Sequence, residues 1–218
     1  MAEPAPAAPQ VPSLRRAVPD DAHQVAPLIL AAAPHLRLLL GGDHGAWHAA
    51  EDAFRSDRTM FGYRFGLVAE GGESLAGFVI AFPGKLWGSL KLGTGVVLAR
   101  AAGVHHAADL VRRGRVLDRL HPAVPRDALY VSALAVDSGH RRQGVARALM
   151  RRAIAGAENL GLDVALDVDL DSEPAWRLYE SLGFRQVSSR ETGEAERALV
   201  ETSGFARLVR SAGSLAGT

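Results

Sequence analysis

The segment from residue 134 to residue 150 constrains this chain more than any other part of the sequence. It begins with the apolar run Leu134-Ala-Val136, passes through an arginine-rich turn that contains Gly144, and continues with hydrophobic residues at three- and four-residue spacing between Val145 and Ile154. The first stretch is typical of a strand, and the last is typical of a helix with one buried face. The sequence therefore predicts a strand and a helix joined by an open turn.

The turn between these two elements has the properties of an anion-binding site. We expect residues 141–146 to form the first turn of the helix, where backbone N–H groups have no intrahelical acceptor and the helix dipole is positive. Gly144 lacks the Cβ atom that would keep a phosphate away from the backbone, and the guanidinium groups of Arg141 and Arg142 add forked donors. The segment therefore predicts a site for a polyphosphate.

Two motifs in order along the chain indicate one family. Neither Gly-x-Gly-x-x-Gly after an early strand nor Gly-x-x-x-x-Gly-Lys-Ser/Thr occurs. The pattern Arg141-x-x-Gly144-x-Ala146 instead resembles motif A of the GNAT superfamily of N-acetyltransferases. Residues 166–184, which end in Leu-Tyr-Glu-Ser-Leu-Gly-Phe, resemble motif B, although Ser172 stands where the family more often has asparagine. In these motifs the chain is similar to protein N-terminal acetyltransferases of the ribosomal-protein-alanine type.

The resemblance implies that acetyl-coenzyme A is the co-substrate. In the family, the motif A strand exposes backbone groups that pair with the pantetheine arm, and the following turn binds the pyrophosphate. A backbone amide aimed at the thioester carbonyl would also stabilise the oxyanion that develops there. The residues that this assigns to the coenzyme are Leu134, Ala135, Val136, Arg141, Arg142, Gln143, Gly144, Val145, Ala146 and Arg147.

The resemblance also implies two catalytic side chains in the motif B block. Tyr179 occupies the helix position whose hydroxyl lies near the coenzyme sulfur in the family, where a phenol can give a proton to the departing thiolate; the alternative is core packing. Asp167 occupies the strand position of a carboxylate base, with Asp169 as a lesser candidate and Ser132 as a holder of a relay water. The alternative for Asp167 is a solvated face, since acids and apolar residues alternate there.

The implied architecture is the GNAT fold, of the α/β (α+β) class. It has a central mixed, mostly antiparallel sheet of about seven strands, splayed between strands 4 and 5 and flanked by helices. From the sequence pattern we expect strands at 14–18, 64–70, 75–82, 134–136, 164–171, 185–189 and 204–209. Helices are expected near residues 23–30, 47–55, 96–120, 141–154 and 195–201, and between Ser172 and Gly183.

A length of 218 residues predicts one domain. We place it at residues 13–210, between an Ala/Pro-rich disordered tail at 1–12 and a flexible tail at 211–218. A helical insertion at about 84–127 has no counterpart in the minimal family fold. Two interpretations stay open for it: a lid, substrate-selecting element or dimer contact, or a helix packed on the sheet with a solvated basic face.

Composition narrows the classes of function. The 25 basic and 24 acidic side chains nearly cancel, which argues against nucleic acid and an anionic membrane as partners. No apolar run approaches the length of a membrane span and the N-terminus lacks the pattern of a signal peptide, so a cytoplasmic protein is expected. No metal site is predicted, because no third ligand is fixed by spacing near the histidines. The absence of cysteine excludes a thiol nucleophile.

The sequence thus predicts an acetyl-coenzyme A-dependent N-acetyltransferase that acts by direct transfer in a ternary complex. The expected partner is an amine-bearing acceptor, either a small molecule or a protein or peptide, and a homodimer is one option. The alternative is a catalytically silent module that binds acetyl-coenzyme A and regulates a partner.

Overall fold

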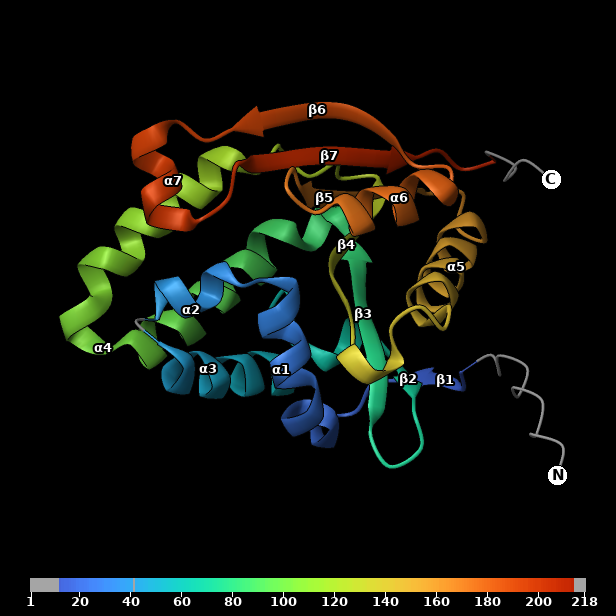
Figure 1. Ribbon diagram of the computed structural model, residues 1–218, viewed down its shortest axis with the longest axis horizontal. Helices are drawn as coiled ribbons and strands as arrows, with labels where there is room; N and C mark the ends of the chain where they lie inside the picture. The colour runs from blue at the N-terminus through green and yellow to red at the C-terminus, as the bar shows by residue number, and fades with distance from the viewer. Residues whose placement is uncertain (1–11, 41, 214–218) are drawn as a thin grey trace, which may run out of the picture.

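Seven strands form one mixed sheet at the centre of the molecule (Figure 1). The computed structural model describes residues 12–40 and 42–213, so the tails expected at 1–12 and 211–218 lie mostly outside it. The strands lie in the order β1-β2-β3-β4-β5-β7-β6. Their bounds are β1 (Leu14–Arg16), β2 (Gly66–Glu70), β3 (Leu75–Pro83), β4 (Ala128–Val136), β5 (Asp163–Asp169), β6 (Arg185–Glu191) and β7 (Gly204–Arg210).

Seven α-helices in the described residues connect and cover these strands. They are α1 (Ala22–Ala32), α2 (His35–Leu39), α3 (Asp43–Arg55), α4 (Trp87–Leu120), α5 (Val145–Glu158), α6 (Glu173–Ser181) and α7 (Glu194–Val200). The short helix α2 was not predicted: Pro34 ends α1 but also stands at the N-cap of α2, a position that proline tolerates. No helix within residues 12–40 and 42–213 is both long and apolar enough to cross a bilayer.

The pairing of the strands confirms the predicted splayed sheet. All neighbouring strands are antiparallel except β4 and β5, which are parallel. These two strands pair only through residues 128–131 and 163–166, and beyond this point they separate. The sheet is therefore mixed, mostly antiparallel and open between its fourth and fifth strands, as expected.

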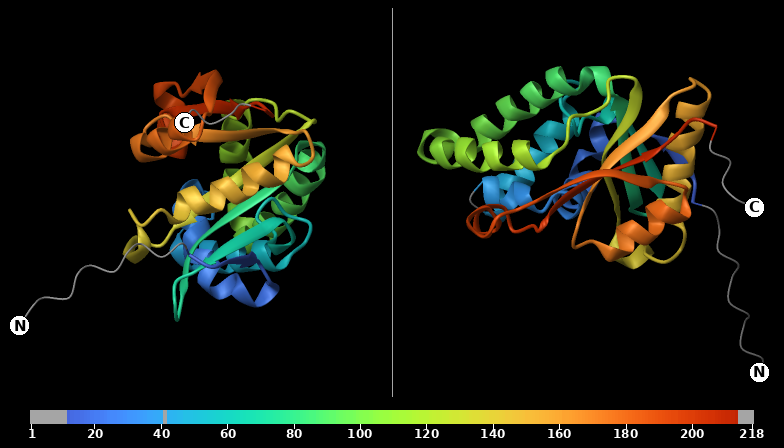
Figure 2. Two further views of the ribbon diagram at one scale, coloured as in Figure 1. Left: turned by 90° about the vertical axis from the view of Figure 1, so that its right-hand side faces the viewer. Right: turned by 90° about the horizontal axis from the view of Figure 1, so that it is seen from above.

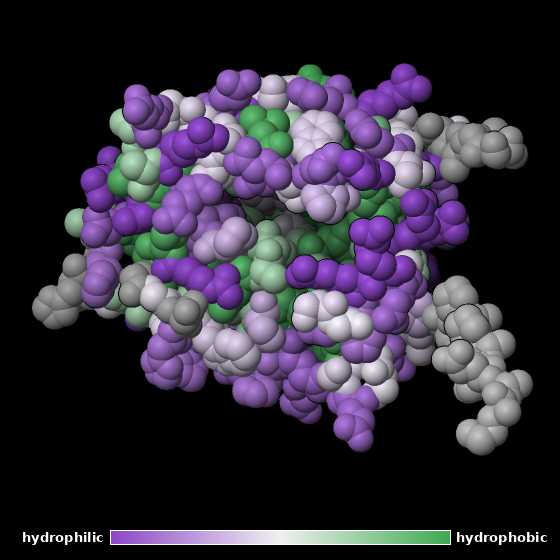
Figure 3. Space-filling view, viewed as in Figure 1, coloured by the Kyte–Doolittle hydropathy of each residue, from purple (hydrophilic) through white to green (hydrophobic). Residues whose placement is uncertain are grey.

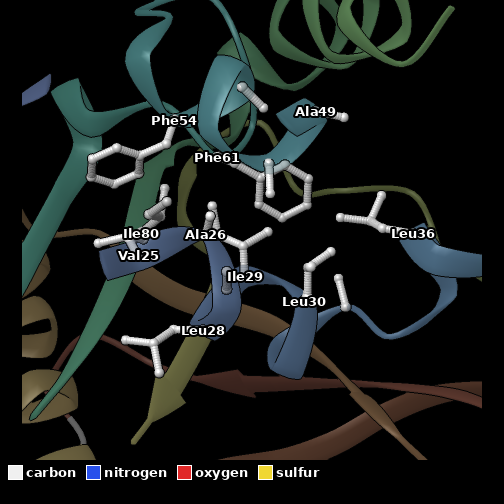
Figure 4. Packing of buried hydrophobic residues seen from close by; sticks show 14 of the residues in the cluster. Val25, Ala26, Leu28, Ile29, Leu30, Leu36, Ala49, Phe54, Phe61 and Ile80 are labelled. Atoms are coloured by element: carbon white, nitrogen blue, oxygen red, sulfur yellow. The ribbon is translucent and has the colours of Figure 1, made fainter. Parts of the chain in front are cut away.

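Two hydrophobic clusters cover the opposite faces of the sheet (Figure 2). The first joins the sheet to α1, α2, α3, α4 and α7, and Figure 4 shows Ile29 and Leu30 of α1 gathered with Phe54 and Phe61 in it. The second joins the sheet to α5 and α6. The predicted apolar face of α5 lies in this second cluster and is buried.

The insertion forms α4, which is longer than predicted and is interrupted at Gly103 (φ 64°, ψ 177°). Some of its apolar side chains, among them Leu90, Val116 and Leu117, are buried in the first cluster, whereas Leu92 is exposed. The helix packs mainly on α2, α3 and α7 rather than on the sheet. Near its start the ring of Trp87 reaches Tyr130 of β4, with centroids 5.1 Å apart. A further role as a lid or dimer contact stays a prediction.

Close contact between β3 and β4 requires glycine at position 77. A Cβ atom on Gly77 would lie 2.7 Å from the carbonyl oxygen of Ala135 and 3.2 Å from Cγ1 of Val145. We expect Gly77→Ala to lower the free energy of unfolding by about 1–3 kcal/mol, measured by urea denaturation. The matched control is Gly156→Ala in α5, where a Cβ atom meets nothing within 4 Å and a gain of about 0.5–1 kcal/mol is expected. Equal stability of Gly77→Ala and wild type would contradict the packing argument.

Candidate active site

The separated ends of β4 and β5 enclose a cavity of about 180 Å³. Residues of both strands line it, together with α6 and the C-terminal end of α1. Ser132 lies at a bulge in β4, because Ile80 pairs with Ala133 and Ala81 pairs with Val131. Figure 3 shows a hollow on this side of the molecule, between β5 and α6 on one side and α1 on the other. A ligand in the hollow can therefore reach the backbone of the separated strands.

The predicted coenzyme residues Leu134, Ala135 and Val136 lie along an open edge of β4. On one side these residues pair with residues 77–79 of β3. On the other side β5 has already separated, so this edge has no partner strand in the described part of the chain. Leu134 also lines the cavity. An extended ligand can bind such an edge as an added strand would.

The turn that was predicted as an anion site lies just beyond this edge, but it is not helical. The helix α5 begins at Val145, rather than at Arg141 as predicted, because Arg142 (φ 64°) and Gly144 (φ 82°) adopt left-handed conformations that a right-handed helix excludes. The N–H of Ala148 donates to the carbonyl oxygen of Gly144 at 2.9 Å, so the N–H groups of the three preceding residues have no acceptor inside the helix. A Cβ atom on Gly144 would meet no atom within 4 Å. The N–H groups and the space expected for an anion are therefore present.

The side chains of the turn surround this open backbone. Arg141, Arg142 and Gln143 are exposed. Gln143 donates to the carbonyl oxygen of Gly139 at 3.1 Å, and Nη2 of Arg147 donates to Oγ of Ser181 in α6 at 2.8 Å. A groove of about 370 Å³ runs between α1 and the end of β4 and reaches Arg141. Nε of Arg141 donates to the carbonyl oxygen of Val136 at 3.5 Å. The Nη groups of Arg141 and the guanidinium of Arg142 thus stay available next to the N–H groups that have no acceptor in the helix.

Tyr179 of α6 lines the cavity from the side of the second cluster. It is buried, and its ring packs edge-on against Phe184 with centroids 5.7 Å apart. Burial raises the pKa of its hydroxyl well above the ordinary value, so the phenol stays protonated at neutral pH. Among the residues that the structure describes, none hydrogen-bonds to this hydroxyl, which leaves it available as a donor.

Asp167 does not lie on a solvated acidic face, because its side chain is only 3% exposed. Its Oδ2 atom accepts hydrogen bonds from Nδ1 of His121, the hydroxyl of Tyr130 and Nη2 of Arg207, each at 3.0 Å. Its Oδ1 atom accepts one from Nε of Arg207 at 2.5 Å. Burial acts to raise the pKa of Asp167, but the hydrogen bonds from His121 and Arg207 outweigh it and hold the pKa below the ordinary value. A carboxylate held in this way has a low affinity for a proton.

The other candidates on β4 and β5 are also engaged. Oδ1 of Asp169 accepts from the N–H of Asp171 at 2.8 Å. The Ser132 hydroxyl, expected to hold a relay water, donates to the carbonyl oxygen of Met60 at 2.7 Å. It retains its acceptor lone pairs for a water.

This geometry agrees with what comparison with known proteins finds. The model of the acetyltransferase (GNAT) family matches residues 36–184. The chain belongs to this family.

Curated relatives of this GNAT chain are similar over a short stretch. N-acetyltransferase 8 of Homo sapiens is 39% identical over 67 residues, which cover 30% of this chain and 30% of that protein. N-alpha-acetyltransferase 30 of Xenopus laevis is 41% identical over 56 residues, which cover 25% of this chain and 20% of that protein. The chain thus matches less than a third of the length of either relative.

Solved structures share the GNAT fold over nearly the whole chain. An N-acetyltransferase from Staphylococcus aureus Mu50 aligns with a TM-score of 0.68 at 19% identity, covering 91% of this chain and 100% of that one. Ard1 from Thermoplasma volcanium aligns with a TM-score of 0.55 at 16% identity, covering 93% of this chain and 98% of that one. At these identities the likeness establishes the fold.

Three residues of the site were missed from the sequence of this GNAT chain: His121, Tyr130 and Arg207. Each lies in a different element, and no local motif joins them to Asp167. One signal was available in β7, where the neighbours of Arg207 on the same face of the strand, Phe205 and Val209, are apolar. A buried arginine requires a buried acid, and an acid on the neighbouring strand was already at hand.

Proposed function

We propose that this GNAT chain is an acetyl-coenzyme A-dependent N-acetyltransferase, which transfers an acetyl group directly to a primary amine of a small molecule, a peptide or a protein. The observation that carries the proposal is the cavity between the separated strands β4 and β5, lined by Leu134 and Tyr179. The names of the similar proteins, which are N-acetyltransferases, support it.

The residues beside the cavity fit acetyl-coenzyme A, which supplies an acetyl thioester when bound. The free N–H groups at the start of α5, together with Arg141 and Arg142, would hold its phosphates. The unoccupied space in front of Gly144 lets a phosphate approach the backbone. The open edge of β4 would pair with the pantetheine amides, and the N–H of Leu134 would donate to the thioester oxygen.

Within this function we assign Tyr179 the role of proton donor to the leaving sulfur. Its cavity position, its protonated state and its unengaged hydroxyl all support the assignment. Asp167, in contrast, keeps its charge and anchors its hydrogen-bonding partners, instead of removing a proton itself. Because the sequence has no cysteine, the amine attacks the thioester directly and no cysteine-bound acyl group forms.

The test is release of free thiol from acetyl-coenzyme A across a panel of small amines and of peptides with free N-termini or lysines. We expect release that depends on the acceptor, with a product heavier by one acetyl group in mass spectrometry. If acetyl-coenzyme A binds in calorimetry but no acceptor causes release of free thiol, the result would favour the silent regulatory module. If acetyl-coenzyme A does not bind at all, the proposal fails.

A further inference from the structure

His121 follows α4 directly and lies against Asp167. Its Nδ1 atom is 3.0 Å from Oδ2 of Asp167, and its ring stacks on Phe205 with centroids 4.4 Å apart. Arg207 fixes the segment that follows, since its guanidinium donates to the carbonyl oxygens of Pro122 at 2.8 Å and Ala123 at 2.6 Å. The imidazole is therefore held in one orientation, while 23% of its surface stays exposed.

The carboxylate of Asp167 determines which ring nitrogen of the neutral imidazole carries the hydrogen. An ionised carboxylate can only accept hydrogen bonds, so Nδ1 of His121 must be the donor. The lone pair of the neutral ring then lies on Nε2, for which the described residues provide no hydrogen-bond partner. An imidazole with an anion at Nδ1 and a free, partly exposed Nε2 has the arrangement of a general base.

The network around Asp167 also reaches the cavity, from the face opposite Tyr179. Asp167 lines the cavity, and the Tyr130 hydroxyl that binds it packs in the first hydrophobic cluster. Tyr179 packs in the second cluster. Burial and the nearby charge of Asp167 raise the pKa of the Tyr130 hydroxyl. The cavity thus has Asp167, which His121 contacts from behind, on one side and Tyr179 on the other.

We propose that His121, oriented by Asp167, is the base that removes a proton from the acceptor ammonium. This inference rests on the proposed function. Nε2 takes one proton of the ammonium, directly or through one water, and leaves a neutral amine that can attack the thioester carbonyl. The second nitrogen proton passes to solvent as the C–N bond forms and the C–S bond breaks. Tyr179 gives its proton to the sulfur and regains one from solvent, and His121 returns its proton to solvent.

The groups around His121 leave it as the candidate base of the cluster. Asp167 of β5 and Arg207 of β7 form an ion pair, and Tyr130 of β4 stays protonated because burial raises its pKa. His35 of α2 lies on the other side of Phe205, with ring centroids 6.5 Å apart. Burial and, to a smaller extent, the charge of protonated His121 lower the pKa of His35 to about 4, so His35 has little affinity for a proton at neutral pH.

Kinetics of His121→Gln test the proposal. The matched control is His48→Gln, which changes a largely exposed histidine of α3 outside the cavity. Glutamine can still donate to Asp167 but cannot act as a base, so we expect kcat/KM near neutral pH to fall by about 100-fold. The affinity for acetyl-coenzyme A should stay unchanged in calorimetry. The loss of kcat/KM in the variant should become smaller as the pH rises, since the acceptor amine is then neutral without a base to deprotonate it. A kcat/KM within about two-fold of wild type, or a deficit that does not change with pH, would overturn the proposal.

The tautomer of His121 gives a readout that does not depend on activity. Long-range proton–nitrogen NMR of the full-length labelled protein, with the signal assigned by its loss in His121→Gln, should show hydrogen on Nδ1 of the neutral ring. Hydrogen on Nε2 instead would overturn the proposal whatever the activity. If NMR shows the expected tautomer but no acceptor is acetylated, the proposed function is wrong. The role of His121 as a base is then wrong as well.

Discussion

Replacement of Arg207 by methionine is expected to lower the free energy of unfolding by about 3–5 kcal/mol. The guanidinium is 2% exposed and pairs with Asp167, which is 3% exposed. Methionine approximates the length of the arginine side chain but leaves the carboxylate buried beside His121 and Tyr130 without its cation. It also removes the donors to the carbonyl oxygens of Pro122 and Ala123. Urea denaturation at neutral pH measures the loss.

This loss should depend on pH with a definite sign. In the wild type the folded pKa of Asp167 is lowered, so its contribution to stability is present above the unfolded pKa of about 4 and is lost as the pH falls through the lower folded value. Without Arg207, burial dominates and raises the folded pKa of Asp167. Protonation then relieves the buried charge, and the difference between wild type and variant narrows as the pH falls from about 7 toward 4.

The matched control for this prediction is Arg177→Met in α6. Arg177 pairs with Glu173 one helical turn away, and both side chains are about three-quarters exposed. An exposed pair of this kind contributes at most about 0.5 kcal/mol, so the variant should unfold like the wild type. If Arg207→Met costs no more than Arg177→Met, the ion pair with Asp167 does not hold the site together.

The parts of the fold that the sequence revealed are those governed by local rules. The spacing of apolar residues in α5, the alternation in β5 and the glycine at position 183, which has a φ of 84° after α6, each left a readable pattern. The helix α4 was expected in the right part of the chain but begins earlier, because Leu90 is buried and Trp87 is partly buried by contacts with distant elements. Its packing partners follow from tertiary structure, which the periodicity of a single helix does not encode.

The candidate site likewise has parts that local sequence patterns predict and parts that they do not. The turn around Gly144 could be predicted because its motif is contiguous. The left-handed conformation of Arg142, which makes the helix begin later than expected, could not be predicted, since arginine rarely adopts that conformation. Alternation placed Asp167 on the side of β5 opposite the apolar residues, but whether that side faced water depended on Arg207 and His121. Both are far from Asp167 in sequence, and only the folded sheet and the end of α4 bring them together.

Tyr179→Phe is expected to reduce kcat by about 100-fold while leaving the affinity for acetyl-coenzyme A almost unchanged. The substitution removes only the hydroxyl, which has no hydrogen-bond partner among the described residues, and it keeps the ring contact with Phe184. The free energy of unfolding should therefore change little, which separates a catalytic role from a structural one. Steady-state thiol release, calorimetry and urea denaturation measure the three quantities.

The pH dependence and a matched variant sharpen this prediction. Because burial raises the pKa of Tyr179, the wild type should show no loss of rate from its ionisation up to about pH 10, where an exposed phenol ionises. Tyr63→Phe removes a hydroxyl from a tyrosine that does not line the cavity, and its kcat should equal that of the wild type. If Tyr179→Phe turns over as fast as Tyr63→Phe, the sulfur takes its proton from water and Tyr179 serves only in packing.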